Sequence, residues 1–461
     1  MTNDTICAIS TPQGTGGIAV IRISGDKAIT IADQLFYAPN GQHILTTLTA
    51  NKAQYGQIKR ADQTLDEVVA TIFRAPHSYT GEDIVEIACH GSIYIQHTLL
   101  QWLIDCGCRL ANPGEFTQRA FLNGKMDLTQ AEAVADLIAS ENQAAHQIAI
   151  KQIKGGIRNE IQQLRDKLLH FTSLIELELD FADHEDLTFA DRTELKQLIS
   201  NIKQRLTQLT DSFQQGNAIK NGIPVAIIGP TNAGKSTLLN QLLHEDKAIV
   251  SDIHGTTRDI IEDTITINNL LFRFIDTAGI RHTQDTIENI GIERALQAAQ
   301  KATIVLIMLD ATMPLEVFQK TLEELKAEIG DAKQIILINK TDLIEQTKKE
   351  QIELQLQNIT HLFISAKSAQ GIDKLQQLLI DNSQINQDYQ HATISNLRHY
   401  EALKRALQAI TQVEQGLNDQ LSGELLSLDL NDCLKALAEI TGEISSQEVL
   451  NNIFSHFCIG K

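Results

Sequence analysis

Residue types that bind phosphate recur within eight positions near the middle of the chain. Residues 229–236 read Gly-Pro-Thr-Asn-Ala-Gly-Lys-Ser. The glycines let the backbone curl so that successive N–H groups face one anion, while a lysine and a serine hydroxyl suit polyphosphate oxygens and a divalent cation. An apolar run at 225–228 precedes the motif and a helical stretch at 237–240 follows it. This strand–loop–helix context predicts a nucleotide-phosphate loop.

Two downstream segments suit the terminal phosphate. Asp276 and Gly279 frame a D-x-x-G motif after the apolar run 271–275. Such a carboxylate can hold a Mg²⁺-bound water, and the glycine N–H can meet a γ-phosphate. Thr257, in the Gly-Thr-Thr-Arg-Asp segment between the two motifs, is the expected second hydroxyl ligand of Mg²⁺ beside Ser236.

Two segments further along the chain are expected to recognise the base of the nucleotide. Residues 339–342 read Asn-Lys-Thr-Asp after an apolar run, and Ser-Ala-Lys follows at 365–367. The carboxylate of Asp342 can accept hydrogen bonds from guanine N1–H and the exocyclic amine, a donor pair that adenine lacks. A backbone N–H of the second segment would meet guanine O6. Five motifs in this order predict a GTP-hydrolysing domain.

Small GTPases orient the attacking water with a glutamine just after the D-x-x-G motif. Here Ile280 and Arg281 follow Gly279, so another residue must orient the water. Glu288 is the candidate, and Lys235 and Asp276 complete the expected catalytic groups of this domain. The candidate GTP-binding residues are Asn232, Ala233, Gly234, Lys235, Ser236, Thr237, Ser251, Asp252, Ile253, His254, Gly255, Thr256, Thr257, Asp276, Thr277, Ala278, Gly279, Asn339, Lys340, Asp342, Ser365, Ala366 and Lys367.

The elements that must position these motifs predict a multidomain chain of the α/β plus α class. Residues 222–380 alternate β-rich runs with helices, which indicates a P-loop domain with a parallel-rich sheet and helices on both faces. Apolar residues at helical spacing fill 128–213 and 394–457. We expect an N-terminal α/β domain at 1–125, a helical domain at 126–215 and 383–461, and an inserted G domain at 216–382. Two separate helical pieces are the alternative.

Composition narrows the function classes. The chain has 461 residues, 43% of them hydrophobic, and a formal net charge of −19. Apolar runs too short to span a bilayer, and a start without a secretion signal, favour a cytoplasmic protein with no membrane role. The acidic balance argues against broad electrostatic binding of nucleic acid, so any contact with RNA is expected to be local or shared with a partner.

Three segments outside the nucleotide motifs resemble one family. They are Ser-Tyr-Thr-Gly-Glu-Asp at 78–83, Pro-Gly-Glu-Phe-Thr-Gln-Arg-Ala-Phe-Leu-Asn-Gly-Lys at 113–125, and the C-terminal Phe-Cys-Ile-Gly-Lys at 457–461. Together with the phosphate loop and the Gly-Thr-Thr-Arg-Asp segment, they resemble the bacterial and organellar tRNA-modification GTPases called MnmE or TrmE. The resemblance runs nearly end to end.

The resemblance implies a homodimer whose N-terminal domain binds a one-carbon folate such as 5-formyltetrahydrofolate, through Arg22, Glu82, Lys125 and Lys461. Arginine and lysine suit the carboxylates of the folate tail, and a glutamate could pair with pterin N–H groups. It also implies a K⁺ ion that offsets transition-state charge. The K⁺ ligands would be Asn232, Ser251, Ile253 and Thr256.

In this family an FAD-dependent partner, MnmG, is expected to join the GTPase in a heterotetramer that modifies C5 of the wobble uridine of certain tRNAs. Cys458 is then a candidate for the modification chemistry, and a packed apolar thiol is the alternative. Two other functions stay open: a ribosome-assembly GTPase, which should carry a basic RNA-binding module, and a folate- or nucleotide-sensing scaffold with little turnover.

Overall fold

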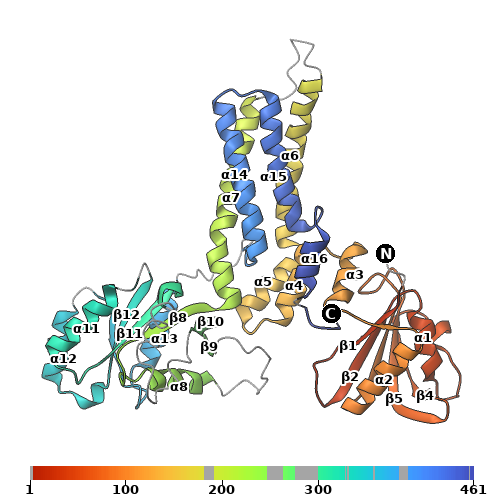
Figure 1. The fold of residues 1–461 in the computed structure, drawn as a ribbon, viewed down its shortest axis with the longest axis horizontal. Helices are drawn as coiled ribbons and strands as arrows, with labels where there is room; N and C mark the ends of the chain where they lie inside the picture. The colour runs from red at the N-terminus through yellow and green to blue at the C-terminus, as the bar shows by residue number, and fades with distance from the viewer. Residues whose placement is uncertain are drawn as a thin grey trace. The chain divides into compact units, whose positions relative to one another are not determined.

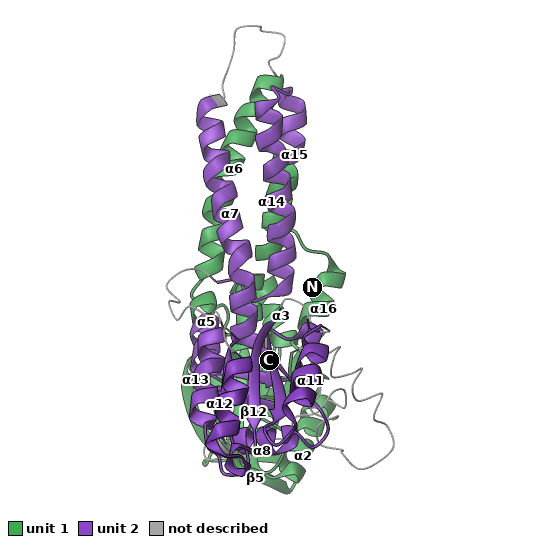
Figure 2. Ribbon diagram, turned by 90° about the vertical axis from the view of Figure 1, so that its left-hand side faces the viewer, with its two compact units in different colours: residues 1–138, 151–189, 430–461 green, residues 139–150, 190–429 purple. Residues whose placement is uncertain are grey.

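The computed structural model describes residues 4–180, 192–246, 263–275, 299–327, 329, 332–356, 359–383, 393–455 and 457–460. They form two compact units, coloured separately in Figure 2: residues 1–138, 151–189 and 430–461 make up the first, and residues 139–150 and 190–429 the second. Among the described residues, no helix has the length and apolar character that crossing a membrane requires.

The first unit begins with a seven-stranded sheet in the order β3-β4-β5-β6-β2-β1-β7. Neighbouring strands are antiparallel except β1 and β7. Mostly apolar runs at 18–23, 68–73 and 84–89, which are typical of strands, lie within β2, β5 and β6. The strands are β1 Ile6–Ile9, β2 Gly16–Ser24, β3 Phe36–Tyr37, β4 Lys52–Arg60, β5 Gln63–Phe73, β6 Ile84–Gly91 and β7 Arg109–Leu110.

Helices α1 (Ala28–Leu35) and α2 (Ile93–Asp105) bury their apolar sides against this sheet (Figure 1). Trp102 of α2, the only tryptophan in the sequence, lies in the shared core. The short 3-10 turn Leu45–Thr47 adds the buried Leu45 to this core. This region is the predicted α/β domain, in which alternating strand residues and helix stripes make one apolar interior.

The rest of the first unit is helical. Helix α16 contacts α3, and a small apolar cluster joins the start of α4 to α16. The long α6 has apolar residues at helical spacing, as predicted. Toward its C-terminal end the buried positions are Thr172 and Ile175, whereas Phe171 and Leu174 are only partly buried. The helices are α3 Glu115–Leu122, α4 Leu128–Ile138, α6 Gly156–Asp180, the larger part of α15 Gly423–Thr441, and α16 Gln447–Ser455.

The second unit contains a six-stranded sheet in the order β13-β12-β11-β8-β10-β9, parallel except for the β9–β10 hairpin. Two apolar cores cover its faces, as expected of a sheet with helices on both sides. Its strands are β8 Ile223–Ile228, β9 Asp263–Ile267, β10 Leu270–Phe274, β11 Ile304–Asp310, β12 Lys333–Asn339 and β13 His361–Phe363. Its helices are α8 Lys235–Asp246, α11 Leu315–Ala327, α12 Gln346–Gln355 and α13 Ile372–Asn382.

Two long helices of this unit, α7 (Arg192–Asn221) and α14 (Leu397–Asn418), pack side by side and antiparallel. Lys203 contacts Glu414 at 2.5 Å, and the rings of Phe213 and Tyr400 stack with centroids 4.4 Å apart. Most of α5 (Gln143–Ile153) also belongs to this unit. Helix α7 continues to Asn221, past residue 215, so it leads into β8 with one intervening residue.

Candidate functional site

The backbone of the phosphate loop requires glycine, or a residue that tolerates a positive φ, at three positions. Gly229 has φ +149°, and a Cβ there would collide with the main-chain oxygen of Met308 on the neighbouring strand. Gly234 has φ +101°, and a Cβ there would collide with the side-chain amide nitrogen of Asn339. Asn232 adopts φ +62°, a region that asparagine tolerates better than most residues. The loop is thus held tightly against strands β11 and β12.

Lys235 closes the loop from the first turn of α8. Its Nζ donates to the main-chain oxygens of Gly229 at 2.7 Å and Pro230 at 2.9 Å. Burial lowers the pKa of the lysine, because the charged form loses solvation. Polyphosphate oxygens at this position would favour the charged form again, which is the role expected of Lys235.

Asn339 links the phosphate loop to the segments predicted to read the base. Its side-chain nitrogen donates to the main-chain oxygen of Ala233 at 2.8 Å, and its side-chain oxygen accepts from the N–H of Ala366 at 2.9 Å. Both bonds are buried. Thr341 donates from its N–H and its hydroxyl to the main-chain oxygen of Ile364. These contacts hold the turn that carries Asp342 against the segment after β13.

The residues predicted to read guanine lie at the carboxyl ends of β12 and β13. Asp342 is exposed, Ser365 and Ala366 are buried, and Lys367 is exposed. Ser365 exchanges two main-chain hydrogen bonds with Gln370, which fixes the turn between them. Ligands of open α/β sheets bind at this edge of the sheet, so a carboxylate acceptor and a nearby main-chain N–H are placed where a base can meet them.

Several predicted residues lie outside the described residues. They are Ser251, Asp252, Ile253, His254, Gly255, Thr256, Thr257, Asp276, Thr277, Ala278, Gly279, Glu288 and Lys461. The predicted nucleotide-binding residues that the structure describes lie in the phosphate loop, in the turn after β12 and in the turn after β13, and Asn339 connects these three segments.

A second candidate site lies in the first unit around Arg22 of β2. Its guanidinium forms an ion pair with Glu86 at 2.8 Å and lies over the rings of Tyr79 and Phe116, with centroids 5.4 and 5.6 Å away. Arg22 also donates to the main-chain oxygen of Gly460 at 3.5 Å. The C-terminal tail therefore ends beside an arginine with aromatic neighbours.

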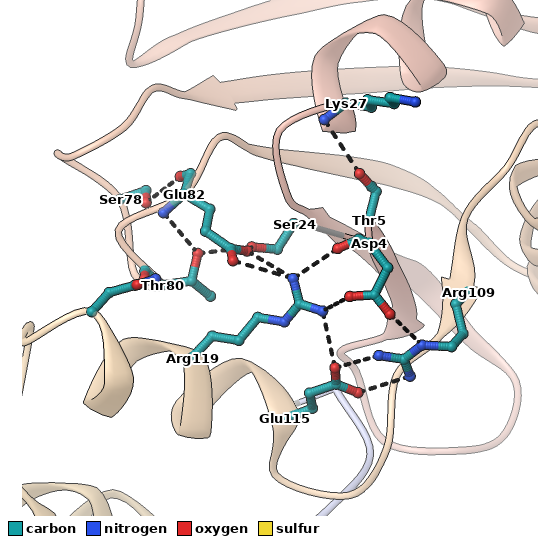
Figure 3. Close-up of polar contacts among 11 residues, drawn as sticks. Asp4, Thr5, Ser24, Lys27, Ser78, Thr80, Glu82, Arg109, Glu115 and Arg119 are labelled. Carbon is teal, nitrogen blue, oxygen red and sulfur yellow. Dashed lines mark hydrogen bonds and ion pairs between the residues drawn. The ribbon is translucent and has the colours of Figure 1, made fainter. Parts of the chain in front are cut away.

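Glu82 belongs to a network of charged side chains (Figure 3). Both of its carboxylate oxygens accept from Arg119 at 3.2 Å, and one accepts from the hydroxyl of Ser24 at 2.7 Å. Arg119 also contacts Asp4 at 2.7 Å and Glu115 at 3.0 Å. Its side chain is only 8% exposed. The hydrogen bonds from Arg119 and Ser24 therefore fix the direction of the Glu82 carboxylate.

Lys125 is brought to the same loop as Glu82. Its Nζ donates to the main-chain oxygen of Pro76 at 2.8 Å, and Asn123 donates to the main-chain oxygen of Thr80 at 2.7 Å. Ser24 and Arg22 are two residues apart on β2 and share a face of the sheet. The predicted folate residues Arg22, Glu82 and Lys125 thus surround one loop.

The sequence did not assign roles to Asp4, Arg109, Glu115 and Arg119. Arg109 contacts Glu115 at 2.5 Å and Asp4 at 2.6 Å. A local signal existed, since Glu115 and Arg119 stand four residues apart at the start of a helix. Their other partners lie elsewhere in the sequence, and only the folded chain brings them together.

Cys458 is exposed. The N–H of Gly114 donates to its main-chain oxygen at 3.4 Å, and the preceding Phe457 is buried against Phe454. Ser10 donates to the main-chain oxygen of Gly460 at 3.2 Å. The tail is thus anchored on both sides of a thiol that stays accessible.

Comparisons with known proteins cover the chain from end to end. A family model described as the GTP-binding protein TrmE N-terminus matches residues 5–125, and one described as the MnmE helical domain matches residues 128–458. A protein of Parabacteroides distasonis named tRNA modification GTPase MnmE is 55% identical over 99% of this chain and 100% of its own length. One of Bacteroides thetaiotaomicron with the same name is 52% identical over 100% of both chains.

Among solved structures, one of Era from Aquifex aeolicus bound to GDP and AlF4⁻ is 27% identical and covers 40% of this chain and 65% of that chain. The TM-score is 0.27.

Proposed function

The chain belongs to the family of the tRNA modification GTPase MnmE, and from this premise and the nucleotide motifs we propose that it hydrolyses GTP as part of tRNA modification. The observation that carries the proposal is Asn339, which joins the phosphate loop at Ala233 to the base-reading segment at Ala366 by two buried hydrogen bonds. One side chain thereby aligns the groups for the phosphates with those for the base.

We propose in addition that the modified position is C5 of the wobble uridine, with an FAD-dependent partner resembling MnmG. The net charge of −19 supports a division of labour in which the partner supplies much of the tRNA contact. The active form would be a homodimer within a heterotetramer, in the cytoplasm. Cys458, exposed on an anchored tail, would take part in the modification.

The residues around the phosphate loop suit metal ions. Ser236 lies in the first turn of α8 and would hold Mg²⁺ together with Thr257, which lies outside the described residues. Asn232 is exposed in a left-handed conformation within the loop, so its amide oxygen could join Ser251, Ile253 and Thr256 around K⁺. Bound there, the ions would offset the charge that develops on the phosphates. Glu288 would orient the attacking water, and Asp276 would hold a Mg²⁺-bound water.

The second site suits a reduced folate. Arg22 offers a guanidinium close to two aromatic rings, Lys125 offers an exposed ammonium, and Lys461 would add a third cation. These suit the carboxylates of the folate tail. Glu82, oriented by Arg119, can accept from the N–H groups of a pterin. We propose 5-formyltetrahydrofolate or a related one-carbon folate as the ligand.

Nucleoside mass spectrometry of bulk tRNA tests the tRNA assignment. Deletion of the gene should abolish C5-modified wobble uridines, and the wild-type gene should restore them while Asp342→Asn should not. Unchanged modification after deletion would eliminate the assignment and leave GTP hydrolysis untouched. Steady-state hydrolysis by the purified chain should also be faster in KCl than in NaCl. Equal rates in the two salts would favour a sensing scaffold.

A further inference from the structure

Lys340 stands out among the base-reading residues because of its backbone. It follows β12 with φ +64° and ψ +36°, a left-handed conformation that is uncommon for a residue with a side chain. Non-glycine residues persist in such conformations where the surroundings over-determine them, often at functional sites. The conformation is combined with a directed side chain, whose Nζ lies 2.6 Å from Oδ2 of Asp310.

Asp310 is the last residue of β11, and in the parallel register its Cα pairs with that of Asn339. It is oriented by contacts of its own. The N–H and the hydroxyl of Thr312 both donate to its Oδ1, at 2.8 and 2.7 Å, which leaves Oδ2 for Lys340. Its side chain is 16% exposed. The carboxylate is thus a fixed acceptor at the end of the strand next to the base-reading turn.

The strand order places this ion pair across the ligand edge of the sheet. Lys340 leaves the end of β12 and reaches the end of β11, and β11 lies between β12 and β8, the strand that leads into the phosphate loop. The methylene chain of the lysine therefore runs along the edge that joins the base-reading turn to the phosphate loop. A flat base bound between them would rest on these methylenes, as lysine stems commonly cover apolar surface.

Resting on the proposed function, we infer that Asp310 is a positioning residue for guanine-nucleotide binding, which acts by holding the Lys340 side chain across the floor of the base site. Burial by itself would raise the pKa of Asp310, but the hydrogen bonds from Lys340 and Thr312 outweigh it and hold the pKa below the ordinary value. The carboxylate is therefore charged at neutral pH. Without it the lysine would exchange among many rotamers, and binding would have to order it.

A double-mutant cycle on the full chain tests the inference. The variants are Asp310→Asn, Lys340→Met and the double variant, and the measurement is the dissociation rate of fluorescently labelled GDP by stopped-flow. The amide can still accept from Thr312, so the turn after β11 is kept. We expect Asp310→Asn to speed release about tenfold, within the range of coupling between contacting residues. In the Lys340→Met background the same change should have no further effect.

Two readouts separate positioning from a general structural role. Asp381→Asn is the matched control, because Asp381 is exposed near the end of α13, where it accepts a hydrogen bond from Gln377 at 2.8 Å. It should leave release unchanged. The preference for GDP over inosine diphosphate depends on Asp342 and should be the same in Asp310→Asn as in the wild type. An additive effect in the double variant, no effect of Asp310→Asn, or a lost preference would each overturn the inference.

Discussion

At the scale of single residues, Gly234 tests the link between the phosphate loop and the base-reading turn. A Cβ there would collide with the side-chain nitrogen of Asn339, and φ +101° adds backbone strain. Gly234→Ala should therefore displace Asn339 and break its bond to Ala233. We expect retention of labelled GDP to fall at least tenfold, measured by filter binding.

The control for Gly234 is Gly41→Ala. Gly41 also has a positive φ, +77°, but a Cβ there would meet open space. It reports the cost of strain without a collision, and it should leave GDP retention unchanged. Equal loss in both variants would mean that the collision with Asn339 does not matter for binding.

Arg119 is the residue on which the charged network of the first unit depends. It pairs with Asp4, Glu82 and Glu115 while almost completely buried. Arg119→Met leaves these carboxylates without their common partner, and breaking a buried ion pair in this way costs about 3–5 kcal/mol. Urea unfolding followed by Trp102 fluorescence measures the loss. Arg60→Met removes an exposed ion pair with Asp105 and should cost less than about 1 kcal/mol.

The same network gives a pH dependence. Burial would raise the pKa values of Asp4 and Glu115, but hydrogen bonds from Arg109 and Arg119 outweigh it and hold both below their ordinary values. Lowered pKa values contribute stability above the unfolded pKa of about 4, and this stability is lost as pH falls through the folded values. The difference in unfolding free energy between wild type and Arg119→Met should therefore be larger at pH 7 than at pH 3. A constant difference would rule out the linkage.

At the scale of elements, two helical glycines make a matched pair. A Cβ at Gly216 of α7 would collide with the main-chain oxygen of Ile394, whereas a Cβ at Gly416 of α14 would meet the end of the Leu426 side chain at 2.9 Å. Alanine favours a helix over glycine by about 0.5–1 kcal/mol. Gly416→Ala should be near neutral because a leucine side chain can move, and Gly216→Ala should destabilise by about 1–3 kcal/mol because a main-chain carbonyl cannot.

Circular dichroism at 222 nm during heating checks this pair, since both glycines lie within helices. We expect Gly416→Ala to melt at about the same temperature as the wild type and Gly216→Ala to melt at a lower temperature. A stabilised Gly216→Ala variant would show that helix propensity outweighs the contact between α7 and the segment at residue 394.

Local pattern was enough to predict most elements. Strands β2, β5 and β6, the strands that precede the nucleotide motifs, and the helical stripes at 157–168 and 403–413 follow from residue spacing, because the side-chain period of each element is a local property. The phosphate loop followed for the same reason. The partners of Arg119 and Asp310 did not, because they lie on other strands and loops, and only the folded chain brings them within hydrogen-bond distance. The continuation of α7 to Asn221 also could not be read from the pattern, since a polar helix end resembles a linker. Strands β1, β3, β4 and β7 were not predicted.

At the scale of the whole molecule, the apolar cores suggest separate responses to nucleotide. Trp102 reports a core around the N-terminal sheet, and the cores on the two faces of the six-stranded sheet contain none of its residues. A ligand that binds only the native state stabilises whatever unfolds with its site, by about 2.7 kcal/mol at a hundred times Kd. GDP should therefore raise the melting temperature of the region around the phosphate loop and leave the transition seen by Trp102 in place. Calorimetry with parallel tryptophan fluorescence measures both. Equal shifts in the two signals would instead mean that the chain unfolds as one cooperative unit, and that nucleotide binding also stabilises the core around Trp102.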